Sequence, residues 1–178
     1  MFLEAVGDIC RGKNVVAYGS SLGAYAAFYF GGPLGAKILA ASPRSSVDDC
    51  ITKFSKRWSH VKWRHGKISD HKTSPEKPVV FWDPLADKRD KVYLQERILP
   101  AYPELEIIPI PQGGHSTFKY LRDKKILKDV FLSVVRDDFS AARTKELLEL
   151  SPGFGEDRTT GIWVFSQNPV SEETKASV

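Results

Sequence analysis

The chain has 178 residues, of which 42% are hydrophobic and 27% are charged, and its formal net charge is +4. These values are typical of one soluble globular domain, and so small a charge does not by itself indicate a nucleic-acid partner. No apolar run approaches the roughly 20 residues of a membrane-spanning helix, and Cys10 and Cys50 predict neither a disulfide framework nor a zinc site.

Apolar patterns divide the first two thirds of the chain into alternating strands and helices. They predict a helix over 2–9, a strand over 14–18, a helix over 22–30, strands over 36–41 and 79–82, a helix over 91–101 and a strand over 106–110. Continuous apolar strands separated by helices indicate a parallel sheet that is covered on both faces. We therefore predict an α/β fold, with a mostly parallel sheet and flanking helices, in a single domain over residues 1–178.

Residues 44–78 differ from their surroundings and read as an insertion or cap between two strands. Ile51, Phe54 and Trp58 share a helical face, and Trp58 and Trp63 are interleaved with basic residues. These are Lys53, Lys56, Arg57, Lys62, Arg64, Lys67 and Lys72. Aromatic and basic side chains together can bind anionic glycans or single-stranded nucleic acid. The alternative, which we favour, is a solvated face whose tryptophans pack on the sheet, so nucleic acid is not the expected partner.

The last third of the chain is predominantly helical in pattern. An apolar stripe runs from Leu127 to Val135, and Ser140 is a candidate cap for a further helix. A late strand is predicted over 161–166, and the polar residues 168–178 are predicted to form a flexible tail.

The segment Gly19-Ser20-Ser21-Leu22-Gly23 lies between a predicted strand and a predicted helix. A sharp strand-to-helix turn strains the central residue, and flanking glycines let the two elements approach without a Cβ clash. The Ser21 hydroxyl would then be presented at the carboxyl edge of the sheet, near the positive end of a helix dipole. The alternative is a glycine-rich turn whose serine caps the helix.

A serine nucleophile needs a base and a carboxylate that orients the base. His115 follows a predicted strand and a Pro-Gln-Gly-Gly turn, where open α/β sheets place their sites; the alternative is a histidine that only stabilises the turn. Asp83, Asp87 and Asp90 follow the strand over 79–82. We choose Asp87, because Asp83 lies close to the strand and Asp90 is expected to begin the next helix. Any of the three could instead be a helix cap.

With these residues in place, the chain resembles the α/β-hydrolase superfamily. The resemblance covers 15–23, 79–87 and 107–115 and preserves the order serine, acid, histidine. It implies a serine hydrolase that cleaves an ester or thioester through an acyl-serine intermediate. Ser21 would be the nucleophile, His115 the base and Asp87 the acid, with Asp83 and Asp90 as alternatives. The expected substrate is a small-molecule or glycan-linked ester, and no metal or organic cofactor is implied.

The sequence departs from this family in starting just ahead of the nucleophile strand. The backbone N–H of Leu22 is one expected oxyanion donor, but the loop that normally provides the second is missing from the sequence. The strand over 14–18 would lie at an edge, where the late strand or a second copy of the chain would cover it, so a homodimer is expected. A catalytically weak or inactive hydrolase-like module for binding or assembly is the alternative function. The start of the chain does not resemble a signal peptide. Two cysteines that suggest no disulfide framework favour a reducing compartment, so we expect a cytoplasmic location.

Overall fold

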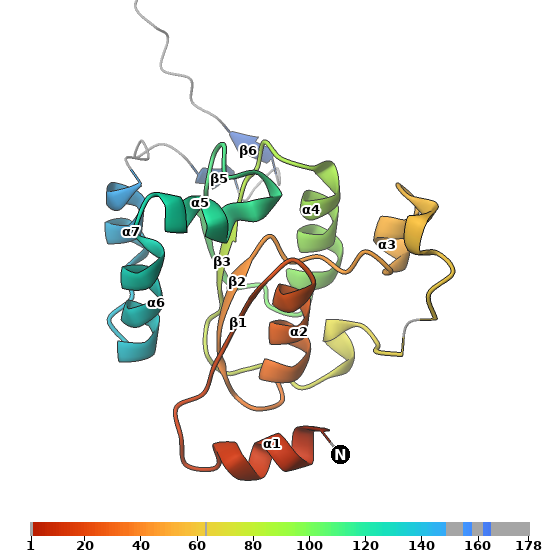
Figure 1. The fold of residues 1–178 in the computed structure, drawn as a ribbon, viewed down its shortest axis with the longest axis horizontal. Helices are drawn as coiled ribbons and strands as arrows, with labels where there is room; N and C mark the ends of the chain where they lie inside the picture. Colours follow the sequence, from red (N-terminus) through yellow and green to blue (C-terminus); the bar gives the residue numbers. More distant parts are fainter. Residues whose placement is uncertain (1, 63, 149–154, 158–161, 165–178) are drawn as a thin grey trace, which may run out of the picture.

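The computed structural model describes residues 2–62, 64–148, 155–157 and 162–164. A sheet of four parallel strands lies at its centre (Figure 1), and the strands follow one another in chain order. They are β1 (Val16–Ser20), β2 (Lys37–Ala41), β3 (Val79–Trp82) and β4 (Glu106–Pro109). The predicted α/β fold with a mostly parallel sheet and a helical C-terminal part is confirmed.

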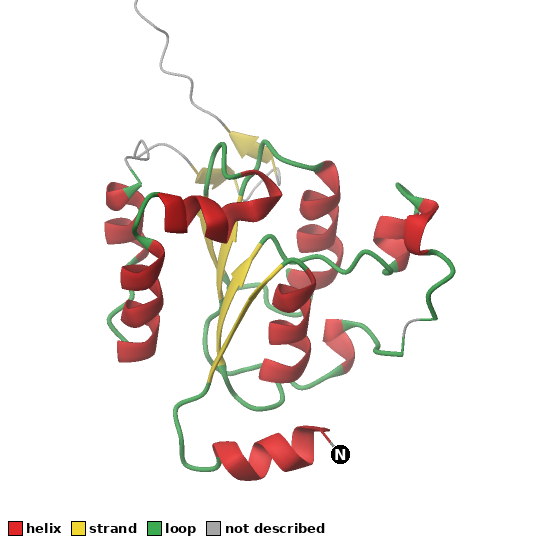
Figure 2. Ribbon diagram, viewed as in Figure 1, coloured by secondary structure: helices red, strands yellow, loops and turns green. Residues whose placement is uncertain are grey.

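Helices cover both faces of this sheet (Figure 2). One face carries α2 (Leu22–Gly31), α4 (Lys88–Tyr93) and the π-helical turn η3 (Leu94–Ile98). The other face carries α5 (Thr117–Asp123) and α6 (Leu127–Arg136). Two further helices, α1 (Phe2–Cys10) and α7 (Ala141–Leu147), lie near the start of β1 and beside α6 (Figure 1). None of the helices in the described ranges is long and apolar enough to cross a membrane.

The central strands explain why the sheet has two apolar faces. On β2, Ile38 and Ala40 pack towards α2, whereas Leu39 and Ala41 pack towards α5 and α6. All four of these residues are at most 1% exposed. Successive side chains on a strand point to opposite faces, so a strand buried on both sides must be apolar throughout.

The strand β1 begins and ends two residues later than the sequence predicts. Gly19 and Ser20 continue the ladder opposite Ala40 and Ala41, and the strand stops only at Ser21. Among the described residues β1 pairs with β2 and its other edge is open, with Tyr18 62% exposed. The expected late strand appears as β6 (Ile162–Val164), but it pairs antiparallel with β5 (Gly155–Asp157). It therefore does not cover β1.

The insertion forms short helical pieces rather than one amphipathic helix. These are α3 (Asp49–Thr52), η1 (Lys56–Trp58) and η2 (Ile68–Asp70). Ile51 is buried, but Trp58 is 42% exposed and stacks on His60. The expectation that the tryptophans pack on the sheet is wrong for Trp58, while Trp63 and the predicted tail over 168–178 lie outside the described residues.

Candidate active site

Ser21 occupies the turn between β1 and α2 in a strained conformation. Its φ of 55° and ψ of −118° lie in a region that L-residues rarely adopt. The turn is held by hydrogen bonds: the Ser21 N–H donates to the carbonyl of Ala41 at 2.9 Å, and its own carbonyl accepts the N–H groups of Tyr25 and Arg44. Strain at a residue fixed by its surroundings is common at functional sites.

The two glycines of the Gly-x-Ser-x-Gly motif have different roles. A Cβ at Gly19 would lie 2.3 Å from the backbone carbon of Gly23, so only glycine fits there. A Cβ at Gly23 would meet nothing within 4 Å. The expectation that both glycines relieve a Cβ clash therefore holds for Gly19 and is wrong for Gly23.

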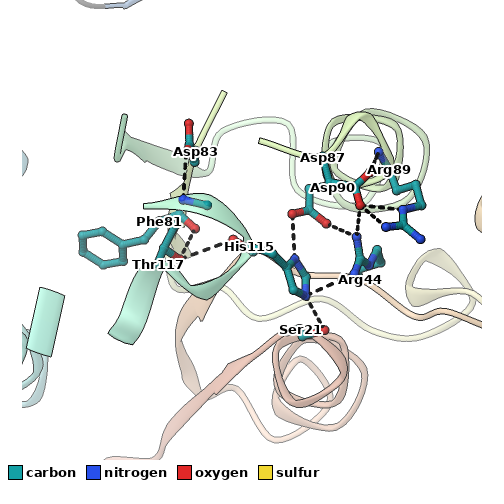
Figure 3. Close-up of polar contacts among 11 residues, drawn as sticks. Ser21, Arg44, Phe81, Asp83, Asp87, Arg89, Asp90, His115 and Thr117 are labelled. Carbon is teal, nitrogen blue, oxygen red and sulfur yellow. Dashed lines mark hydrogen bonds and ion pairs between the residues drawn. The ribbon is translucent and has the colours of Figure 1, made fainter. Parts of the chain in front are cut away.

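His115 lies in the 3-10 turn η4 (Gly114–Ser116), directly beyond the carboxyl end of β4. Gln112 and Gly114 both have positive φ, which folds this loop back over the sheet edge. The Nε2 atom of His115 lies 2.8 Å from Ser21 Oγ, and its Nδ1 atom lies 2.7 Å from Asp90 Oδ2 (Figure 3). A carboxylate only accepts hydrogen bonds, so Nδ1 carries the proton and Nε2 presents its lone pair to the serine.

The carboxylate on His115 is Asp90, the alternative acid, and not Asp87. The reason is where α4 begins. Asp87 is the residue that caps this helix, because its side chain accepts the N–H of Arg89 at 2.9 Å. Asp90 lies within the first turn, so its side chain is released from capping and points towards His115. Its side chain is 0% exposed.

Asp83 binds the backbone of the loop that carries His115, and none of its observed hydrogen bonds reaches the imidazole. One carboxylate oxygen accepts the N–H of Gly114 at 2.8 Å and the other accepts the N–H of Leu85 at 2.8 Å. Asp83 is 3% exposed, so these charge-assisted bonds form away from water. Thr117, which is fully buried, ties the same loop to the ends of β2 and β3 by contacts with Ser42 Oγ and the carbonyl of Phe81.

Arg44 completes the cluster, although no motif in the sequence pointed to this residue. Its Nη1 atom lies 2.8 Å from Asp90 Oδ1 and 3.2 Å from Asp87 Oδ2, and its Nη2 atom lies 3.3 Å from His115 Nε2 (Figure 3). Arg89 also binds Asp87. The hydrogen bond from Arg89 holds the pKa of Asp87 well below its usual range, although partial burial acts in the opposite direction. Two carboxylates and two guanidinium groups thus balance in charge.

The backbone N–H of Leu22 directly follows Ser21, at the start of α2. Leu22 is the first residue of α2, where N–H groups have no partner within the helix and the helix dipole is positive. A role for this N–H as an oxyanion donor stays a prediction.

Only part of the insertion lies against α2: η2 packs beside this helix, whereas α3 packs against α4 (Figure 1). Tyr25 donates from its hydroxyl to the carbonyl of Gly66 at 3.1 Å, and the ring of Tyr29 lies 4.3 Å from that of His71. Lys62 and Arg64 are exposed. A role for the insertion as a cap that selects substrates stays a prediction.

Within the described ranges, no group of three or more His, Cys, Asp or Glu side chains is arranged to hold a metal ion. Comparisons with protein-family models, curated proteins and solved structures found no match to this chain. The resemblance to α/β hydrolases therefore depends on the motif and on the geometry of this site.

Proposed function

We propose that the protein is a serine hydrolase that cleaves an ester or thioester through an acyl-serine intermediate. The observation that carries this proposal is the continuous hydrogen-bonded chain from Ser21 Oγ through His115 to Asp90, with distances of 2.8 and 2.7 Å. These contacts give the serine a base and give the base a buried carboxylate, which is the arrangement that activates a serine.

In the first step, Ser21 Oγ attacks the carbonyl carbon of the substrate. The serine O–H bond breaks and its proton moves to His115 Nε2, while the π electrons of the carbonyl become an oxyanion. The oxyanion accepts a hydrogen bond from the N–H of Leu22. When the intermediate collapses, the bond to the leaving group breaks, and His115 returns the proton to the departing oxygen or sulfur.

In the second step, water replaces the leaving group. His115 takes a proton from this water, the oxygen attacks the acyl carbon, and the ester bond to Ser21 breaks. The carboxylic acid leaves and Ser21 recovers its proton. Asp90 stays ionised throughout and stabilises the imidazolium that forms twice in the cycle.

A fluorophosphonate probe tests this function, because it phosphonylates an activated serine. We expect the probe to label the wild-type protein and Ser20→Ala, the matched control on β1, and not to label Ser21→Ala or His115→Ala. Labelling of Ser21→Ala at the wild-type rate, or no labelling of folded wild-type protein, would refute the proposal.

The proposed substrate class is a small-molecule or glycan-linked ester, with the exposed basic insertion favouring an acidic group. The proposed location is cytoplasmic, and both cysteines are unpaired. If reversing the charges of Lys62 and Arg64 with glutamate leaves the relative rates on anionic and neutral esters unchanged, the substrate preference is wrong.

The open edge of β1 favours a second candidate, an assembly function in which two chains pair. Tyr18 is exposed there and lines a groove of about 330 Å³ together with Phe118 and Phe131. Unpaired strand edges readily add a strand from another chain. A homogeneous monomer in sedimentation at high protein concentration would contradict a homodimer.

A further inference from the structure

Arg44 contacts both Asp90, the proposed acid, and His115 Nε2, the nitrogen proposed to take the serine proton. It follows β2, and its backbone N–H donates to the carbonyl of Ser21 at 3.2 Å. Its side chain is 11% exposed. The residue is therefore fixed at both ends, next to the serine through its backbone and next to His115 through its guanidinium.

The three nitrogens of this guanidinium have different surroundings. Nη1 donates to Asp87 and Asp90, whereas Nε is buried and has no hydrogen-bond partner among the described residues. Nη2 lies 3.3 Å from His115 Nε2, the same atom that accepts the proton of Ser21. Figure 3 shows the contacts from Arg44 and from Ser21 converging on this ring nitrogen.

This convergence cannot persist once the reaction starts. The neutral imidazole has one lone pair at Nε2, which in the resting site is shared between the serine hydroxyl and the guanidinium. When Nε2 takes the serine proton it becomes a donor, and two donors then face each other. The Nη2 group loses its acceptor at the moment when a negative oxygen forms on the carbon bonded to Ser21.

We propose that Arg44 is a catalytic residue, and that its Nη2 group turns from His115 Nε2 to the carbonyl oxygen of the substrate as Ser21 attacks. Arg44 is then the second oxyanion donor beside the N–H of Leu22. This inference rests on the proposed hydrolase function. The guanidinium only donates a hydrogen bond and keeps its protons throughout, because arginine stays charged in proteins.

The charges of the cluster argue against the simplest other role for Arg44, which is to bind an anionic group of the ground-state substrate. Asp87 and Asp90 already compensate its charge. An oxyanion that forms during the reaction is different, because it appears when His115 gains a proton. The positive imidazolium then shares the negative charge of Asp90, so the charge of Arg44 is less fully compensated. Donors that bind only the developing charge raise kcat rather than lower KM.

The test compares Arg44→Ala and Arg44→Lys with Arg89→Ala, using p-nitrophenyl acetate and the fluorophosphonate probe. Arg89 binds the same Oδ2 atom of Asp87 as Arg44 does but makes no observed contact with His115, so its removal controls for loss of charge in the cluster. Loss of one oxyanion donor lowers kcat by roughly 10²- to 10³-fold. We expect that loss in Arg44→Ala, with KM changed less than about threefold, and less than about threefold loss in kcat for Arg89→Ala.

Arg44→Lys separates catalysis from positioning. A lysine retains a cation beside Asp90 but has no second nitrogen to reach the oxyanion, so we expect kcat at least about tenfold below wild type. Millimolar guanidinium should restore part of the activity of Arg44→Ala in a saturable manner and should restore none in Ser21→Ala. If Arg44→Lys has the kcat of wild type, or if Arg44→Ala folds and remains within about threefold of wild type, Arg44 is not an oxyanion donor. Both results leave the hydrolase proposal intact, because that proposal is refuted by different results: labelling of Ser21→Ala at the wild-type rate, or no labelling of folded wild-type protein.

Discussion

Replacing Asp90 with asparagine is the sharpest test of which carboxylate serves His115. The two oxygens of Asp90 have separate partners, since Oδ1 accepts from Arg44 and Oδ2 accepts from His115 Nδ1. An asparagine has one acceptor oxygen and one amide donor, and at a side chain that is 0% exposed no water can compensate. If the amide faces His115, it selects the tautomer with the proton on Nε2, which cannot accept the proton of Ser21.

From this geometry we expect Asp90→Asn to lower kcat by about 10⁴-fold, the loss seen when a buried triad acid becomes an amide. The free energy of unfolding should fall by about 1–3 kcal/mol, because a buried donor loses its acceptor. Asp87→Asn is the matched control, because asparagine also caps helices and the contact between Asp90 and His115 is untouched. We expect at most about a tenfold loss for this variant.

Burst kinetics with p-nitrophenyl acetate measure the acylation rate of each variant, and urea unfolding measures its stability. Two results would refute the assignment of Asp90. One is a folded Asp90→Asn protein that acylates within about tenfold of wild type. The other is an Asp87→Asn protein that loses as much activity as Asp90→Asn.

Three further predictions concern the two motif glycines, the hydrogen bonds of Asp83 and the pKa of Asp87. Gly19→Ala should lower the thermal midpoint strongly because its Cβ would lie 2.3 Å from backbone, whereas Gly23→Ala should leave it unchanged or higher, as measured by circular dichroism. Asp83→Asn should slow fluorophosphonate labelling by about 10- to 100-fold, because the amide cannot offer charged acceptors to the N–H groups of Gly114 and Leu85; an unchanged rate would contradict its role in holding the histidine loop. The pKa of Asp87 is lower in the folded protein than its unfolded-state value of about 3.9, so the ionised side chain stabilises the fold at pH values above about 3.9. This contribution is lost as the pH falls below that value. The stability difference between wild type and Asp87→Asn in urea unfolding should therefore be largest near pH 7 and shrink towards pH 2.5.

The sequence was sufficient to predict the sheet, because each central strand is a continuous apolar run bounded by clear turns. It also predicted that Ser21 and His115 would lie near each other, since a motif at a strand-to-helix turn and a histidine after a later strand both lie at the carboxyl edge of a parallel sheet, and the structure brings them into contact. These predictions needed only the order of elements along the chain.

The acid could not be chosen in the same way, because Asp87 and Asp90 lie three residues apart and the choice depends on where α4 begins. A start at Asp90 would leave Asp87 in the loop, whereas the observed cap at Asp87 turns Asp90 towards His115. Helix ends are uncertain by several residues in any reading of a single sequence. One signal was available, however: a cap three residues ahead of an acid is a common start for a helix.

Arg44 shows what a search for catalytic residue types leaves out. It follows β2 just as His115 follows β4, so the rule that sites collect at the carboxyl ends of parallel strands applied to it equally. The four side chains of this cluster come from the segments that follow four consecutive strands: Ser21 after β1, Arg44 after β2, Asp90 after β3 and His115 after β4. In a sheet whose strands lie in chain order, each of these segments is a neighbour of the next, so the pairing of the strands brings the four side chains together.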